Sequence, residues 1–526
     1  MTTVETTKER MTRRFFEILP GFVAWFTIVA IFPLSYYTPV LVALFVILYD
    51  LSWLIKIVHI SAHLIYSYHE VRKTWKTDYP KLLSELEGES KKPGSNILNW
   101  RDVYHIVVLP TAKESFEVLD TTIQAIVRAD YPKDKIMILL AIEDRSGELG
   151  RENARRLHEK YDNVFYKFAS YFHPSDIPGE IKAKSSNMTF AMRSFRKEIE
   201  TSGIPIDNIV VSAFDSDTQA SKEYFGCLTY HYVNNPNRTR FSYQPIPVFH
   251  NNIWEVPAIA RVTAMSSTFW QMIEASRPQR LITFSSHAMS YKALVDVDYW
   301  PVKVISEDSQ IFWRCYLKYD SNYWVEPMFT TVSMDATEGE TYWKSYVAQY
   351  IQKQRWFWGI ENFPYISLGF LKNKRIPVYK KISQWARMLD SFYTLATAPI
   401  ILLVGGWLPL TLGGKAFANN VVSQNLISLT SILTGLALVG LVTTFIISIL
   451  LVPTRPTHRT SLVTLSMMAQ WVLVPIVTIF FGSVPAIDSQ TRLMLGKYMG
   501  EFWVADKVRR NPKDKPKSLS PSAPRK

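Results

Sequence analysis

Long apolar runs lie at the two ends of the chain, and between them apolar and polar positions alternate at short intervals. Two apolar runs stand near the start, at about residues 15–32 and 39–58. At about 1.5 Å per residue of helix, each run is long enough to cross the apolar core of a bilayer, which is about 30 Å thick. The pattern therefore predicts two membrane-spanning helices before the middle section begins.

Three further apolar segments follow the middle section, at about residues 392–412, 426–452 and 462–481. The first two read as membrane spans. The third contains Gln470 and Pro475, so we expect either a span or a membrane-embedded, re-entrant segment. Beyond it the chain becomes basic and rich in Pro and Ser, a composition that predicts a disordered tail.

The middle section has the pattern of an α/β domain. An apolar run at 104–109 is followed by a polar turn, a helix-like segment at 119–128 and a second apolar run at 136–142. Strand, helix and strand with polar residues after each strand is typical of a doubly wound sheet, where ligands collect beyond the carboxyl ends of the strands. The pattern divides the chain into a membrane segment at 1–70, the α/β domain at 96–380, membrane and interface helices at 381–487, and an amphipathic segment with a basic tail at 488–526.

Basic residues are concentrated beside the predicted spans. The chain has 526 residues, 48% of them hydrophobic, and a net charge of +13. Lys and Arg next to spans stay on the cytoplasmic side of a membrane, and Arg13, Arg14 and Arg455 are placed accordingly. We therefore expect a multi-pass protein of the cell membrane, in contact with lipids, with its N-terminus and α/β domain in the cytoplasm. We also expect a cytoplasmic tail, which requires that the last apolar segment does not cross.

The composition disfavours a nucleic-acid partner and disulfide bonds. The chain shows no module in which aromatic and basic residues alternate as in nucleic-acid-binding domains, so we expect no nucleic-acid partner. Its two cysteines, Cys227 and Cys315, lie far apart in the α/β domain without metal-ligand spacing. We therefore expect reduced thiols in the core.

Acidic residues follow the predicted strands where a ligand would collect. Asp215 and Asp217 come directly after the apolar run at 208–214. Two carboxylates one residue apart suit Mg²⁺ or Mn²⁺, which can bridge them to diphosphate oxygens, although a solvated turn carries the same pattern. Glu307 and Asp308 further along are either catalytic acids or an acid pair that stabilises a helix start. No Gly-x-Gly-x-x-Gly follows the first strand, so a dinucleotide-binding domain is disfavoured.

In their order along the chain, these motifs resemble those of membrane-embedded family 2 glycosyltransferases, in the cellulose synthase and hyaluronan synthase group. The resemblance covers about residues 103–356 and the flanking spans, and it rests on Val108-Leu109-Pro110 with Glu114, Glu143-Asp144, Lys182 to Asn187, Asp215-Ser216-Asp217, Glu307-Asp308 and Gln352-x-x-Arg355-Trp356. It implies a GT-A domain, that is, an α/β Rossmann-like nucleotide-diphospho-sugar transferase fold, in the cytoplasm and flanked by transmembrane helices.

The resemblance also implies a role for individual residues. Donor binding falls to Glu114, Glu143, Asp144, Lys182 and Asp215, with the nucleobase contact chiefly at Asp144 because Glu143 replaces the family's first aspartate. Asp215 and Asp217 would bind the metal, and Asp308 would be the general base. Residues implied on the acceptor or diphosphate side are Glu307, Gln352, Arg355, Trp356 and, on a looser match, Ser286 and His287. Phe502, Val504 and Lys507 resemble a gating loop that here lacks the family's threonine.

The activity implied is that of a processive, inverting glycosyltransferase. Such an enzyme takes a UDP-sugar as donor, extends a β-linked polysaccharide and passes it through its own spans, with or without accessory secretion proteins. Two alternatives stay open: a non-processive transferase with a lipid-linked acceptor, and a non-catalytic membrane transporter or scaffold. Product length separates the first alternative from the polymerase, and UDP release excludes the second. The sugar and the linkage are not specified by the sequence.

Overall fold

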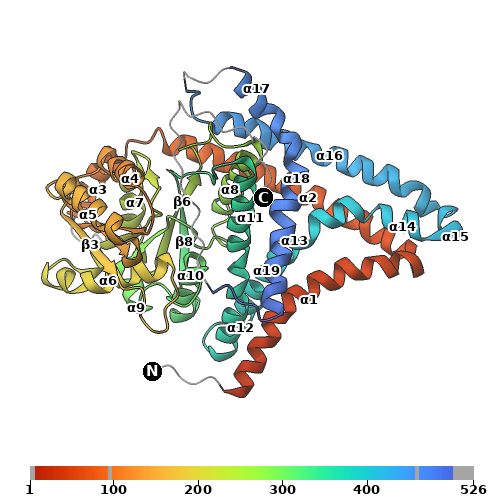
Figure 1. The fold of residues 1–526 in the computed structure, drawn as a ribbon, viewed down its shortest axis with the longest axis horizontal. Coiled ribbons are helices and arrows are strands. Elements are labelled where there is room, and N and C mark those ends of the chain that lie inside the picture. The colour runs from red at the N-terminus through yellow and green to blue at the C-terminus, as the bar shows by residue number, and fades with distance from the viewer. Residues whose placement is uncertain (1–5, 93–96, 457–460, 501–526) are drawn as a thin grey trace, which may run out of the picture.

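The computed structural model describes residues 6–92, 97–456 and 461–500, and it places an α/β domain beside long helices (Figure 1). The domain is built on an eight-stranded sheet with the strand order β3-β2-β1-β4-β7-β6-β8-β5. The strands are β1 (Tyr104–Thr111), β2 (Ile136–Glu143), β3 (Lys167–His173), β4 (Ile209–Ala213), β5 (Gln219–Ala220), β6 (Phe241–Val248), β7 (Ala288–Ser290) and β8 (Trp324–Ser333).

Strand direction places the ends of three strands at one edge of the sheet. Strands β3, β2, β1 and β4 run parallel. Strand β7 runs antiparallel to both β4 and β6, and β8 is parallel to β6 and antiparallel to β5. The carboxyl ends of β1, β2 and β4 therefore meet at the same edge, where ligands bind in sheets of this kind.

The central strands are buried on both faces, which explains their nearly continuous apolar sequence. In β1, Val107 and Leu109 pack into one hydrophobic core, and Ile106 and Val108 pack into another. Successive side chains of a strand point to opposite faces, so one strand serves two cores. The runs predicted as strands at 104–109, 136–142 and 208–214 coincide with β1, β2 and β4, and the helix predicted at 119–128 is α4.

Helices cover both faces of the sheet. The first core includes residues of α3 (Tyr79–Ser90), α4 (Phe116–Arg128), α5 (Gly147–Tyr161) and α7 (Tyr224–Asn234). The second includes residues of α6 (Lys184–Thr201), α9 (Tyr291–Asp296), α10 (Glu307–Lys318) and α12 (Asn362–Lys372). Helices α8 (Ala258–Ala275) and α11 (Tyr342–Phe357) lie between this domain and the long helices (Figure 1).

Five helices are long and apolar enough to cross a membrane, with lengths of 27 to 36 residues against the roughly 20 that a bilayer requires. They are α1 (Thr7–Tyr37), α2 (Pro39–Thr74), α13 (Val378–Val404), α16 (Val421–Leu451) and a composite helix at Leu465–Met494. The short helices α14 (Trp407–Leu412) and α15 (Gly414–Ala418) connect α13 to α16. This composition is compatible with a membrane protein.

The composite helix is irregular where the sequence contains Gln470 and Pro475. It comprises the later part of α17 (Ser461–Ala469), then α18 (Val474–Thr478) and α19 (Val484–Met494), joined by a 3₁₀ turn at Gln470–Leu473 and a π turn at Ile479–Ser483. Its length permits a full crossing, so the re-entrant alternative is not required by length. The side on which each end lies stays a prediction.

Two further sequence predictions concern the cysteines and the C-terminal segment. Cys227 and Cys315 are buried, unbridged thiols, as predicted. The gating-like residues Phe502, Val504 and Lys507 and the basic tail lie outside the described residues.

Candidate functional site

A cavity of about 1260 Å³ opens at the carboxyl edge of the sheet and continues between the long helices. Its walls include the segments after β1, β2 and β4, the start of α10, and parts of α2, α8, α11 and α13. The predicted site residues that line it are Glu114, Glu143, Lys182, Asp215, Asp217, Glu307, Asp308, Gln352, Arg355 and Trp356. Motifs more than 200 positions apart along the chain thus meet around one space.

Within the described residues, three predicted site residues do not line the cavity. Asp144 is exposed on the turn after β2. Ser286 and His287 are fully buried. Their neighbour Ser285 lines the cavity instead and donates a hydrogen bond to Asp215 Oδ2 at 2.6 Å. The predicted roles of these three residues in nucleobase and acceptor binding stay predictions.

Lys184 is the electrostatic centre of the site. Its Nζ lies 3.0 Å from Asp215 Oδ1, 2.7 Å from Asp308 Oδ2 and 3.2 Å from Glu307 Oε1. Burial lowers the pKa of the Lys184 ammonium, but attraction to Asp215, Asp308 and Glu307 outweighs burial and raises that pKa well above its usual value. Lys184 therefore stays charged and holds together three acids from two separate motifs.

The prediction from the sequence placed Lys182 near the diphosphate and gave Lys184 no role of its own. Helix α6 begins at Lys184, and Lys182 lies two residues before it. Both lysines line the cavity, but the ion pairs with the three acids belong to Lys184. The only signal in the sequence was the repeated lysine in Lys-Ala-Lys, which does not say which side chain turns toward the acids.

Replacing Lys184 should destabilise the domain. Lys184→Met leaves three buried or half-buried carboxylates without their cation, and breaking a buried ion pair from one side costs about 3 to 5 kcal/mol. We expect a clearly lower melting temperature for the purified protein, measured by tryptophan fluorescence. Lys182→Met is the matched control, because no such cluster depends on it, and equal melting temperatures for the two variants would contradict this account.

The turn that carries Asp215 and Asp217 is held by hydrogen bonds to neighbouring segments. Asp217 is only 2% exposed, and its Oδ2 accepts a hydrogen bond from the backbone N–H of Asp335 at 3.1 Å. Between the two acids, Ser216 donates to Glu114 Oε1 at 3.0 Å. Glu114 Oε2 accepts the backbone N–H of Ala112 at 2.7 Å. Glu114 therefore fixes the turn after β1 against the Asp-Ser-Asp turn.

The donor atoms around Asp215 and Asp217 suit a metal that arrives with its substrate. Across residues 6–92, 97–456 and 461–500, no three side chains of His, Cys, Asp or Glu form a group that could hold an ion by themselves. Mg²⁺ is commonly bound through one or two carboxylates, with substrate phosphates and water completing its coordination. The carboxylates of Asp215 and Asp217 are hard oxygen donors on the cavity wall, and they fit that arrangement.

The two carboxylate oxygens of Asp308 differ: one contacts Lys184, and the other is buried without a hydrogen-bond partner in the described chain. Its Oδ2 contacts Lys184, whereas Oδ1 has no hydrogen-bond partner within the described part of the chain. The nearest ring nitrogen, His287 Nδ1, lies 3.8 Å away and donates to the carbonyl oxygen of Phe284 at 2.8 Å. Burial lowers the pKa of His287, which favours the neutral ring. The Asp308 side chain is 22% exposed and lines the cavity, so its carboxylate as a whole is the candidate proton acceptor.

Glu361, which the sequence did not single out, positions the segment before Asp308. Its Oε1 accepts hydrogen bonds from the backbone N–H of Ser306 at 2.8 Å and from Ser306 Oγ at 2.7 Å. Its Oε2 accepts from Trp358 Nε1 at 3.0 Å. Burial raises the pKa of Glu361, while these hydrogen bonds oppose that shift. Glu361 thus links the end of α11 to the start of α10, and no motif marks it.

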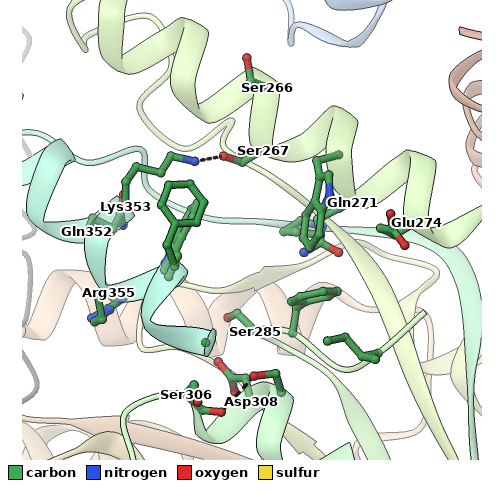
Figure 2. A pocket seen from close by; sticks show the side chains of 18 of the residues that line it. Ser266, Ser267, Gln271, Glu274, Ser285, Ser306, Asp308, Gln352, Lys353 and Arg355 are labelled. Atoms are coloured by element: carbon green, nitrogen blue, oxygen red, sulfur yellow. Dashed lines mark hydrogen bonds between the residues drawn. The ribbon is translucent and has the colours of Figure 1, made fainter. Parts of the chain in front are cut away.

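Helix α11 carries the Gln-x-x-Arg-Trp residues to the cavity wall. Figure 2 shows Gln352, Lys353 and Arg355 on this helix and Asp308 on a separate segment of the cavity wall. Gln352 Oε1 accepts a hydrogen bond from Thr337 Oγ1 at 2.6 Å. Burial lowers the pKa of the Arg355 guanidinium, and attraction to nearby acids, Glu307 first, opposes this. Trp356 is 38% exposed and lines the cavity, so its indole can meet a ligand.

Comparisons with known proteins add limited information. No protein-family model matches the chain, and no curated protein matches it. Similar solved structures include a mannosyltransferase, PcManGT from Pyrobaculum calidifontis, in complex with GDP-Man and Mn²⁺, with 13% identity, a TM-score of 0.40, and coverage of 75% of this chain and 99% of that one. S. aureus TarS 1-349 in complex with UDP-GlcNAc gives 12% identity, a TM-score of 0.36, and coverage of 77% and 95%.

Proposed function

We propose that this chain is a membrane-embedded, processive, inverting glycosyltransferase with a GT-A catalytic domain. It would transfer sugar from a UDP-sugar to a growing β-linked polysaccharide and move the product across the membrane. The observation that supports this most is the convergence of Asp215, Asp217 and Asp308 with Arg355 and Trp356 on one cavity that continues between membrane-type helices.

The chemistry is a single displacement. A hydroxyl oxygen of the acceptor attacks the anomeric carbon of the donor sugar on the face opposite the diphosphate. The new bond forms as the bond between that carbon and the diphosphate oxygen breaks, and UDP leaves with the electron pair. The hydroxyl proton passes to the carboxylate of Asp308, whose side chain is partly exposed at the cavity wall. Attack from the opposite face inverts the anomeric configuration.

The leaving group needs positive charge, because negative charge accumulates on the diphosphate as the bond breaks. Lys182 and Arg355 line the cavity and supply cationic donors there, while Lys184 holds the acids in place. A Mg²⁺ or Mn²⁺ ion held by Asp215 and Asp217 would neutralise diphosphate charge when bound. Positioning and electrostatics would therefore account for most of the rate.

The continuation of the cavity supports a polymer as acceptor. Beyond the acids it is lined by Trp356 and by residues of α13 such as Phe392 and Thr394. The composite helix contributes Val477, Thr478, Phe481 and Gly482. A saccharide could enter this space with its terminal hydroxyl toward Asp308. The indole of Trp356 offers an apolar platform for a sugar ring. On the charge rule, we place the catalytic domain in the cytoplasm.

A direct test uses the full-length protein purified in detergent. It is incubated with several UDP-sugars and with Mg²⁺ or Mn²⁺, and both UDP release and product length are measured. A long polymer supports the proposal. A product limited to a monoglycosylated lipid supports the non-processive alternative, and absence of UDP release with every donor supports a transporter or scaffold.

Loss of the Trp356 indole should reduce polymer length more than it reduces UDP-sugar binding. Trp356→Ala removes the indole from the acceptor side of the cavity, so we expect shorter or no polymer, with UDP-sugar binding retained and slow donor hydrolysis continuing. Size-exclusion chromatography of the product and calorimetric UDP binding measure the two effects. Trp343→Ala is the control, because Trp343 is on the same helix but 74% exposed and outside the cavity lining. Unchanged polymer length in Trp356→Ala would make this indole a membrane anchor.

A further inference from the structure

Lys353 is a buried cation on the acceptor side of the cavity. It lies within the Gln-x-x-Arg-Trp segment, is only 8% exposed, and still lines the cavity. Its Nζ donates a hydrogen bond to Ser267 Oγ of α8 at 2.7 Å (Figure 2). The same nitrogen lies 4.3 Å from the centre of the Trp356 ring. The ammonium and the indole therefore share one part of the cavity wall.

No carboxylate of the described chain forms an ion pair with Lys353. The carboxylate of Glu274, which also lines the cavity, is paired with Arg277. Burial, with no opposing attraction, lowers the pKa of Lys353 to about 7. Lys184 in the same cavity is the opposite case, because three carboxylates surround it. A buried cation is costly unless an anion reaches it, so an anionic group of a ligand in the cavity would supply the partner that the chain does not.

We propose that Lys353 recognises the carboxylate of a hexuronate unit in the acceptor chain, so that the polymer made by this protein contains acidic sugars. The proposal rests on the proposed function and adds the acceptor's chemical class to it. An ammonium group has three donors, and the bond to Ser267 uses one. A sugar unit bound at this wall would meet the indole through its apolar face and the ammonium through its carboxylate.

A phosphate is a poorer candidate for this position. Phosphate sites commonly combine several donors, as arginine forks or backbone amides do. The cations proposed for the diphosphate are Lys182 and Arg355, and the acids proposed for its metal are Asp215 and Asp217. Lys353 lies beside α8, on a separate segment of the cavity wall from Asp308 (Figure 2). The Lys353 ammonium has one hydroxyl partner, Ser267, and its remaining donors suit a single carboxylate.

The test compares two tetrasaccharides that differ only in their acidic groups. The probes are cellotetraose and its derivative oxidised at C6 to the tetraglucuronate, and calorimetry measures their binding to the full-length, detergent-purified protein loaded with UDP. The wild-type protein should bind the tetraglucuronate more tightly than cellotetraose by roughly 10- to 100-fold, as expected for a hydrogen bond between charged groups. Lys353→Gln should remove this preference, while Lys353→Arg should keep most of it.

Lys344→Gln is the matched control, because Lys344 is on the same helix, 62% exposed and paired with Glu340. It should leave the preference unchanged. A wild-type protein that binds the two probes equally, or a preference that survives in Lys353→Gln, would overturn the proposal. Polymer made from neutral UDP-sugars by a protein with no preference for the acidic probe would overturn this inference and leave the proposed function standing. Absence of UDP release with every donor would overturn the proposed function instead.

Discussion

Asp217→Asn should abolish sugar transfer while the fold survives. Asparagine has the same shape as aspartate and keeps an oxygen that can accept the hydrogen bond from the backbone N–H of Asp335. It lacks the negative charge, however, and a neutral amide is a much poorer ligand for a hard divalent cation. If the metal supplies several kcal/mol of charge stabilisation in the transition state, the loss in rate is about 10³-fold or more.

Two measurements make this prediction specific to the metal. UDP binding to the wild-type protein should depend on Mn²⁺ or Mg²⁺, and this dependence should disappear in Asp217→Asn. Asp134→Asn is the control, because the exposed Asp134 precedes β2 at the amino end of that strand, away from the cavity. Full activity of Asp217→Asn in the presence of a chelator would show that Asp217 serves no metal.

Local patterns predicted the elements that position the site. Strand β1 could be predicted because burial on both faces demands an apolar residue at nearly every position, as at Val107 and Val108. The same applies to β2 and β4. Once these strands are taken as parallel neighbours, the acids after them fall at one edge of the sheet. The convergence of Glu143 and Asp215 on a single cavity follows from that geometry.

Contacts between distant segments could not be predicted from the sequence. The ion pairs of Lys184 depend on the residue at which α6 begins. The role of Glu361 depends on the folding of the turn after α11 against the start of α10. Similarly, Ser285, and not Ser286, reaches Asp215, because Ser286 adopts a left-handed backbone conformation with φ of 63° and its side chain is buried. One residue of offset decides which hydroxyl faces the cavity.

For the apolar helices, the sequence predicted their positions but not the path of the last one. Run length located the helices, since an apolar run must match the thickness of the bilayer. It did not decide between a span and a re-entrant segment for the last helix, where the irregular turns at Gln470–Leu473 and Ile479–Ser483 keep the chain helical. An odd number of crossings would place the two ends of the chain on opposite sides. The expectation of a cytoplasmic tail therefore depends on the path of this last helix.

Asp308→Asn should slow transfer by about 10² to 10⁴ without loss of donor binding. The amide can still accept a hydrogen bond from Lys184, so the arrangement of Asp215 and Glu307 around that lysine should persist. What the variant loses is a carboxylate oxygen that can take the acceptor's proton, and a general base contributes about that factor to a rate. Single-turnover kinetics with saturating acceptor measure the step directly.

The decisive comparison is between the rate and the affinity for UDP. If Asp308 is the base, only the rate falls, because proton transfer takes place at the acceptor, on the opposite side of the sugar from the diphosphate. If affinity for UDP falls by the same factor, Asp308 acts in donor binding, through Lys184 or a metal, and another group must take the proton. Asp298→Asn controls for a general effect of charge, since Asp298 is exposed and paired with Arg193 at the surface. Asparagine is also well suited to the positive φ of 58° at that position, so the control should fold and turn over like the wild-type protein.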